Sequence, residues 1–191
     1  MSLRIVPHLL ICFRLAAGLA IVGLAWRFGK DARYTCVTLL GLGVLSDIFD
    51  GVIARRLGSV TEGLRTFDSR VDLVFWLGVT AAVMILHPGL FASTWPVIAV
   101  LGVMEATTHL VSFARFRREA SPHHLLSKLF GLALWALLTE MLITGNGGWL
   151  KTPVFLLGVT SQIEALAIML LLPAWRPDVR GFREAIELRR R

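Results

Sequence analysis

Long apolar stretches separated by short polar breaks make up most of the chain. Six of them are long enough to cross about 30 Å of hydrocarbon as helices that rise about 1.5 Å per residue. They lie near residues 8–27, 34–57, 67–87, 94–114, 125–145 and 153–173. Turn-forming and charged residues fill the breaks, as in "RFGKDAR", "HPGL" and "TGNGGWLKTP". The pattern predicts an all-α integral membrane protein with a six-helix domain over residues 1–175 and a basic cytosolic tail over 176–191.

Polar residues occur inside the predicted spans, where lipid-facing positions would be apolar. Examples are Arg14, Glu105, His109, Glu140 and Glu164. Ionisable groups within a membrane are costly and face a protein interior or a polar cavity. The six helices are therefore expected to pack as a bundle with these groups turned inward. Arg14 could reach a site elsewhere or pair with one of the three glutamates, and we expect the pairing.

Composition agrees with the span pattern and excludes an ordinary soluble domain. Mean hydropathy is +0.69, and 55% of the 191 residues are hydrophobic while only 17% are charged. The net charge of +7 fits contact with anionic lipid. The sequence has no stripe of basic residues interleaved with aromatic residues, so a nucleic-acid partner is not expected. Cys12 and Cys36 both lie in apolar runs, which indicates neither a disulfide framework nor a cysteine metal site.

The basic residues are distributed unevenly between the two sides of the predicted membrane domain. Fifteen of the 20 lysines and arginines lie at the N-terminus, in 55–70, in 114–128 or in the tail, and four lie in the other loops. The positive-inside rule then places both termini in the cytosol. The tail "RGFREAIELRRR" is either an amphipathic helix on anionic headgroups or a solvated basic segment.

The stretch "SDIFDGVIARRLGSVTEGLRTFDSRVDL" carries four aspartates between the second and third predicted spans. Two are spaced i,i+3 and two are spaced i,i+4, so each pair shares one face of its helix. A hairpin folded near Gly58 and Ser59 would bring both pairs to one depth, about 15 Å below the turn and close to the cytosolic interface. The four residues are Asp47, Asp50, Asp68 and Asp72.

Four clustered carboxylates in a membrane domain require compensation. Insertion scales give ~3 kcal/mol for each charged residue at the centre of a span, so the cluster costs on the order of 5–10 kcal/mol. Neighbouring arginines could offset part of this, and divalent cations could offset more. Carboxylate oxygens without Cys or nearby His indicate Mg²⁺, Mn²⁺ or Ca²⁺ rather than zinc. Two cations about 3.5–4 Å apart would suit in-line displacement at phosphorus.

Small residues continue the acidic face toward the end of the second predicted span. Asp47, Gly51, Ala54 and Gly58 recur at helical spacing. The stripe favours close helix packing, while a smooth wall for a flat ligand is the alternative. Arg55 lies one turn beyond Gly51, and a guanidinium binds phosphate oxygens bidentately.

These residues resemble the signature of the CDP-alcohol phosphotransferase (phosphatidyltransferase) family, D-x2-D-G-x2-A-R-x8-G-x3-D-x3-D. "DIFDGVIAR", twelve residues and "DSRVD" agree with it at seven of its eight fixed positions over 26 residues. The eighth position holds Leu64 where the family pattern has glycine, and Gly63 precedes it. The six-span plan extends the likeness over most of the chain.

The resemblance implies an enzyme of phospholipid synthesis in a bacterial inner membrane, with its active site facing the cytosol. It would transfer a phosphatidyl group from a CDP-linked lipid such as CDP-diacylglycerol to an alcohol and release CMP. We expect glycerol 3-phosphate as acceptor, as in phosphatidylglycerophosphate synthases. Serine, inositol phosphate and choline stay open as acceptors, as does a non-catalytic CDP-lipid-binding relative, suggested by Leu64. A divalent cation transporter is a remote alternative. The family also suggests a homodimer.

The resemblance also implies roles for individual residues. Two Mg²⁺ or Mn²⁺ ions would be held by the four aspartates, with Asp72 also serving as general base on the acceptor hydroxyl. CDP would contact Asp47, Gly51, Ala54 and Arg55. A phosphate on the acceptor would be bound by basic residues of the fourth to fifth span loop, for which plain topogenic charge is the alternative. These are Arg115, Arg118 and Lys128.

Overall fold

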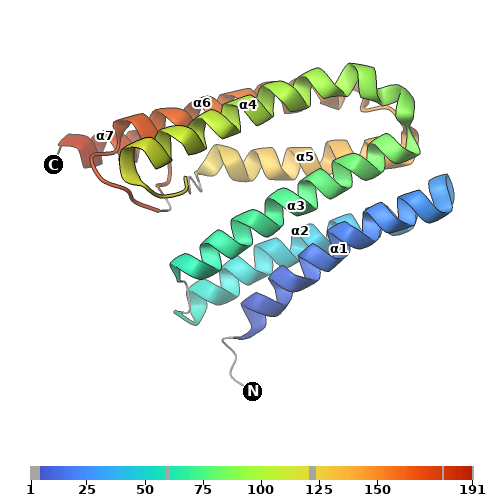
Figure 1. The fold of residues 1–191 in the computed structure, drawn as a ribbon, viewed down its shortest axis with the longest axis horizontal. Helices are drawn as coiled ribbons and strands as arrows, with labels where there is room; N and C mark the ends of the chain where they lie inside the picture. The colour runs from blue at the N-terminus through green and yellow to red at the C-terminus, as the bar shows by residue number, and fades with distance from the viewer. Residues whose placement is uncertain (1–4, 59–60, 121–123, 178, 191) are drawn as a thin grey trace. The chain divides into compact units, whose positions relative to one another are not determined.

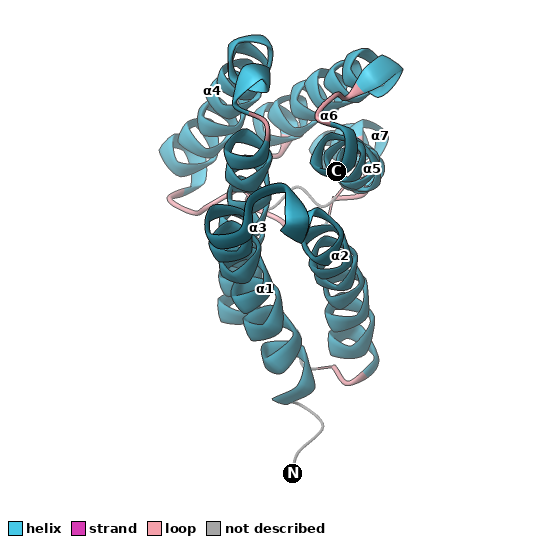
Figure 2. Cartoon of the chain, turned by 90° about the vertical axis from the view of Figure 1, so that its right-hand side faces the viewer, coloured by secondary structure: helices cyan, strands magenta, loops and turns pink. Residues whose placement is uncertain are grey.

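A computed structural model describes residues 5–58, 61–120, 124–177 and 179–190. Within these ranges the regular structure is helical throughout (Figures 1 and 2). The long helices are α1 Val6–Phe28, α2 Arg33–Arg56, α3 Glu62–Leu86, α4 Phe91–Phe116, α5 Leu125–Thr144 and α6 Lys151–Leu171. Short 3₁₀ turns are η2 Gly29–Ala32, η3 Pro88–Leu90 and η4 Gly148–Leu150, and α7 spans Phe182–Arg190.

The six predicted spans correspond to helices α1 to α6, and all six lie in stretches that are long and apolar enough to cross a membrane. Helices α1 and α2 are joined by η2 into one helical stretch, in which Gly29 adopts a φ of +57° that a side chain would disfavour. The predicted all-α membrane fold is confirmed.

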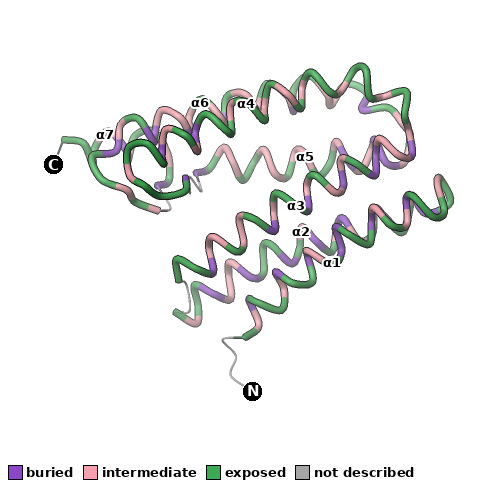
Figure 3. Tube along the Cα trace, viewed as in Figure 1, coloured by how far each residue is buried: buried purple, intermediate pink, exposed green. Residues whose placement is uncertain are grey.

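The helices divide into two compact units. The first contains α1, α2, α3 and η3, with the last part of α5. The second contains α4, the first part of α5, η4, α6 and α7. Figure 3 shows that buried positions recur along the three helices of the first unit, α1, α2 and α3, at the spacing expected of mutually packed helices.

Helices α1, α2 and α3 approach one another closely around Phe75, which is 1% exposed. A Cβ atom added to Gly43 would lie 2.4 Å from Cζ of Phe75, and one added to Gly18 would lie 3.1 Å from Cα of Phe75. One turn along α3, a Cβ at Gly78 would lie 3.1 Å from the carbonyl oxygen of Gly18. Glycines here permit the close backbone contacts that hold membrane helices together.

Gly43→Ala is expected to destabilise the protein by about 1–3 kcal/mol, because the new methyl group overlaps the buried ring of Phe75. Gly41→Ala is the matched control on the same helix, since no described atom outside the adjoining backbone and chain neighbours lies within 4 Å of a Cβ built there. The control should be neutral or slightly stabilising, because alanine favours helix over glycine. Thermal unfolding in detergent measures both, and equal melting temperatures for the two variants would contradict the packing described.

In the second unit, α7 is docked on the end of α6 rather than free. Ala185 of α7 is buried with Ile168, Met169 and Leu172. Arg180 N donates to Glu184 Oε2 at 2.7 Å within the segment that leads into α7. The tail therefore contains a helix whose apolar side packs against protein. The expected contact of this helix with lipid headgroups stays a prediction.

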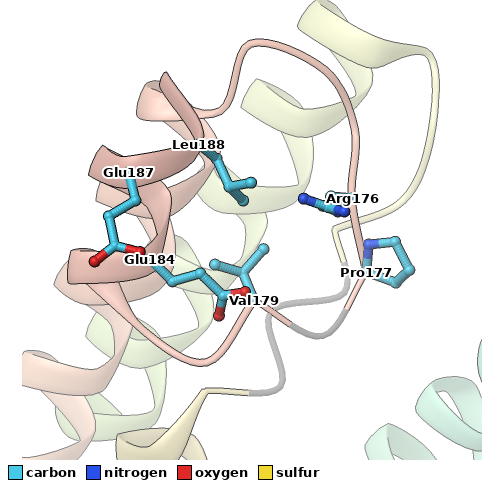
Figure 4. Close-up of a pocket in the computed structure, with 6 residues that line it drawn as sticks. All are labelled: Arg176, Pro177, Val179, Glu184, Glu187 and Leu188. Carbon is cyan, nitrogen blue, oxygen red and sulfur yellow. The ribbon is translucent and has the colours of Figure 1, made fainter. Parts of the chain in front are cut away.

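Glu164 fastens the start of α7 to α6. Its Oε1 accepts from Phe182 N at 3.0 Å, and its Oε2 lies 2.9 Å from Nδ1 of the buried His124. A pocket of about 340 Å³ lies between the segment before α7 and α7 itself (Figure 4). It is lined by Arg176, Pro177, Val179, Glu184, Glu187 and Leu188.

Candidate functional site

The turn between α2 and α3 is bounded by a left-handed glycine and a helix cap. Helix α2 ends at Arg56, and Gly58 has a φ of +59°. Helix α3 begins after Thr61, whose Oγ1 accepts from Leu64 N at 3.1 Å and so satisfies an amide at the helix start. Ser59, expected to form part of the turn, lies outside the described residues.

The hairpin brings carboxylates from its two helices together. Ligand oxygens of Asp47 and Asp50 on α2 and of Asp68 on α3 all lie within 4.8 Å of one another. Asp72, one turn beyond Asp68, faces the same position, because it contacts the same arginine as the other three. The aspartate pairs of α2 and α3 therefore lie at one depth, as the hairpin spacing predicts.

That shared arginine is Arg14 of α1. Its Nη1 lies 2.7 Å from Asp47 Oδ1 and also contacts Asp72 Oδ1. Its Nη2 lies 2.7 Å from Asp68 Oδ1 and also contacts Asp50 Oδ2. Each terminal nitrogen therefore lies between one carboxylate of α2 and one of α3.

The expected pairing of Arg14 with a glutamate is wrong. Helix α1 packs against both α2 and α3, which directs residue 14 at the hairpin. Glu105 is instead bound by His109 at 3.0 Å and by Gln162 at 2.5 Å. Glu164 holds the start of α7 as described above.

The charge of the cluster is only partly compensated by Arg14. Four carboxylates carry four negative charges and the guanidinium carries one positive charge, which leaves three negative charges when all groups are ionised. Asp50 is 4% exposed, so part of this charge is shielded from water. A set of hard oxygen donors with an excess of negative charge fits Mg²⁺ or Mn²⁺.

Beside the carboxylates, the half-buried Gly51 and the exposed Arg55 lie next to each other on α2. A Cβ at Gly51 would lie 3.3 Å from Nη1 of Arg55, so the guanidinium lies over the glycine. Arg55 is exposed at this end of α2. The arrangement leaves its guanidinium accessible to a phosphate group.

Ala54 and Leu64 are packed in the core of the hairpin. They are 5% and 8% exposed and share one cluster with Ile11 and Val71. Leu64, at the position where the resemblance predicts glycine, therefore fills space next to Ala54. Sequence reasoning identified the departure at position 64 but not that its side chain supports the packing of α1 on the hairpin.

The three basic residues expected to bind the acceptor belong to the second unit. Arg115 donates to Leu172 O at 3.1 Å and also to Met169 O, so it caps the last carbonyls of α6. The guanidinium of Arg118 lies 4.9 Å from the centroid of the Trp175 ring. Lys128 is exposed in the first turn of α5. Their role toward an acceptor stays a prediction.

Fold and site together define a helical integral membrane protein with a carboxylate cluster suited to divalent cations, at a hairpin that also presents an exposed arginine. Comparison with protein families identifies which membrane proteins the chain is related to. The model of the CDP-alcohol phosphatidyltransferase family matches residues 4–175, so the chain belongs to that family. It is a phosphatidyltransferase of phospholipid synthesis, with a CDP-alcohol donor and an alcohol acceptor. Neither the curated proteins nor the solved structures contain a match to the chain.

Proposed function

We propose that the protein transfers the phosphatidyl group of CDP-diacylglycerol to glycerol 3-phosphate and releases CMP at the cytosolic side of a bacterial inner membrane. The observation that carries the proposal is the convergence of four carboxylates on the α2–α3 hairpin. The same hairpin carries the family signature, and its basic flanks support a cytosolic orientation.

Asp47, Asp50 and Asp68 would hold the divalent cations, two Mg²⁺ or Mn²⁺ ions, because their oxygens already lie within 4.8 Å of one another. Bound there, such ions would neutralise the diphosphate and stabilise the phosphate of the departing CMP. The side chains of both helices would determine where the diphosphate binds, since α2 and α3 each supply part of the carboxylate set.

Asp72 would accept the proton of the acceptor hydroxyl. It borders the group of three close carboxylates without belonging to it, among the side chains that the structure describes. Asp72 lies one turn beyond Asp68 on α3, and the alcohol would approach the donor phosphate beside it. Positioning of the hydroxyl would supply much of the rate.

Gly51 and Arg55 would receive the donor. Because Gly51 has no side chain, the guanidinium of Arg55 can lie over its backbone, and this guanidinium would bind a diphosphate oxygen. Ala54 would support this surface from the core beneath it.

Arg115, Arg118 and Lys128 would bind the phosphate of glycerol 3-phosphate. The present partners of Arg115 are neutral carbonyls, and a phosphate forms stronger, charge-assisted hydrogen bonds with a guanidinium. Serine, inositol phosphate and choline stay open as acceptors, and the homodimer suggested by the family resemblance stays a prediction.

The test is CMP release by the purified protein in detergent with CDP-diacylglycerol. Glycerol 3-phosphate, serine, inositol phosphate and choline are supplied separately, each with Mg²⁺ and with Mn²⁺. Glycerol 3-phosphate should give the fastest release, and EDTA should abolish it. CMP release with only one of the other acceptors would overturn glycerol 3-phosphate as the acceptor. No CMP release with any acceptor would favour a non-catalytic relative.

A substitution at position 64 distinguishes the hypothesis of an active enzyme from that of a non-catalytic relative. Leu64→Gly is expected to reduce stability by about 2–5 kcal/mol without raising turnover, because it leaves a cavity between Ile11, Ala54 and Val71. Unfolding and CMP release measure the two effects. Leu77→Gly, at an exposed position of the same helix, should cost only the ~1 kcal/mol of helix propensity. A large gain in turnover for Leu64→Gly would show that Leu64 blocks the site.

A further inference from the structure

Arg14 is bound to the same carboxylate groups that would hold a metal ion. Its two terminal nitrogens contact one oxygen of each of the four aspartates. The side chain is 1% exposed and is held by α1, which is not part of the signature hairpin. A third helix therefore contributes a cation to the centre of the site.

The guanidinium and divalent cations exclude each other from these oxygens. A Mg²⁺ ion requires oxygens at about 2.1 Å in near-octahedral geometry, which leaves no space for a nitrogen between the same atoms. The two cations would also repel each other at this distance. A divalent cation that takes these oxygens therefore requires Arg14 to leave at least part of its contacts.

The observed contacts of Arg14 also leave one donor unused. Its Nε is buried and has no acceptor among the described residues. A buried donor without a partner costs free energy. Moreover, one guanidinium supplies a single positive charge to four carboxylates. The arrangement therefore suits a resting state better than a permanent structural ion pair.

We propose that Arg14 is a positioning residue that holds the four carboxylates together before metal binds and is displaced when divalent cations enter. It prevents the like charges on α2 and α3 from pushing the hairpin apart. It also acts as a tethered competitor that raises the metal concentration needed to fill the site. This inference rests on the metal site of the proposed function.

The test is metal binding to the full-length protein in detergent, without substrates. Wild type, Arg14→Gln and Arg27→Gln are titrated with Mn²⁺, and the melting temperature and the electron paramagnetic resonance signal of free Mn²⁺ are recorded. Arg27 lies exposed in the last turn of the same helix, away from the aspartates, and serves as matched control. Saturating Mn²⁺ at about 100 times its dissociation constant should raise the wild-type melting temperature by about 5–10 °C.

Arg14→Gln should melt below wild type in EDTA, bind Mn²⁺ at least about tenfold more tightly, and gain more than wild type on metal addition. A factor of ten corresponds to about 1.4 kcal/mol. Arg27→Gln should match wild type throughout. If Arg14→Gln does not stay folded without metal, it is purified in Mn²⁺. Its melting temperature should then fall more steeply with added EDTA than that of wild type.

Three results would overturn the inference. Unchanged or weaker Mn²⁺ binding by Arg14→Gln would show that the arginine does not compete with metal. Failure of this variant to fold even in saturating Mn²⁺ would show that the guanidinium is needed in the loaded state. Absence of Mn²⁺ binding by both wild type and variant would instead contradict the metal site on which the proposed function depends.

Discussion

Asp72→Asn is expected to lower CMP release at least ~10³-fold while the protein keeps its fold. An amide cannot accept the proton of the acceptor hydroxyl, and general-base catalysis typically contributes 10²–10⁴-fold. Asparagine retains the size of the side chain at the edge of the carboxylate cluster, so the packing of α3 should persist. Steady-state CMP release and thermal unfolding of the purified variant measure the two properties.

The control for this prediction is Asp31→Asn. Asp31 is exposed in η2, at the end of α1 and α2 away from the hairpin turn, and its amide should leave turnover unchanged. If Asp72→Asn retained more than about a tenth of wild-type turnover, well above the loss expected of a general base, Asp72 could not hold that role.

Asp50→Asn is expected to lower CMP release at least ~10²-fold and also to remove most of the stabilisation by Mn²⁺. Substituting even an outer-shell partner of a metal typically costs 10–100-fold, and Asp50 is one of the three carboxylates with mutually close oxygens. Because it is 4% exposed, water cannot easily replace the lost ligand. Mn²⁺ titration followed by the melting temperature measures the loss.

Comparison of the two variants separates metal binding from proton transfer. Asp72→Asn should keep most of the rise in melting temperature with Mn²⁺, whereas Asp50→Asn should not. Equal loss of this rise in both variants would show that Asp72 is as important a metal ligand as Asp50. Full retention in Asp50→Asn would contradict a metal site at the group of three carboxylates.

The sequence was informative where a repeating pattern determines the structure. Apolar stretches predicted α1 to α6 to within about five residues at each end, because spanning the membrane fixes their length. The convergence of Asp47 and Asp50 with Asp68 and Asp72 followed from helical spacing and the symmetry of the pairs about a turn.

The depth of Arg14 could have been predicted from the sequence, but not the direction in which its side chain points. It lies eight residues from the start of α1, or about 12 Å, while Asp50 and Asp47 lie six and nine residues before the end of α2, or about 9–14 Å. Antiparallel neighbours place these positions at one level. Spacing could not show whether residue 14 faces the hairpin, since that depends on the rotation of α1 about its axis.

Two further contacts lie beyond what a linear pattern can indicate. Arg115 caps carbonyls of α6, 54 and 57 residues away in the chain. Leu64 fits against Ile11 of another helix, and this depends on the shapes of both surfaces. Such contacts join residues whose types alone permit many partners.

The hydrogen bond between Glu164 and the start of α7 affects any shortened form of the protein. The family match ends at residue 175, but the carboxylate of Glu164 accepts its hydrogen bond from Phe182, beyond that boundary. Truncation at residue 175 would uncover the apolar side chains of Ile168, Met169 and Leu172 and leave Glu164 without its amide donor. The packed structure around α6 therefore extends beyond the homologous region.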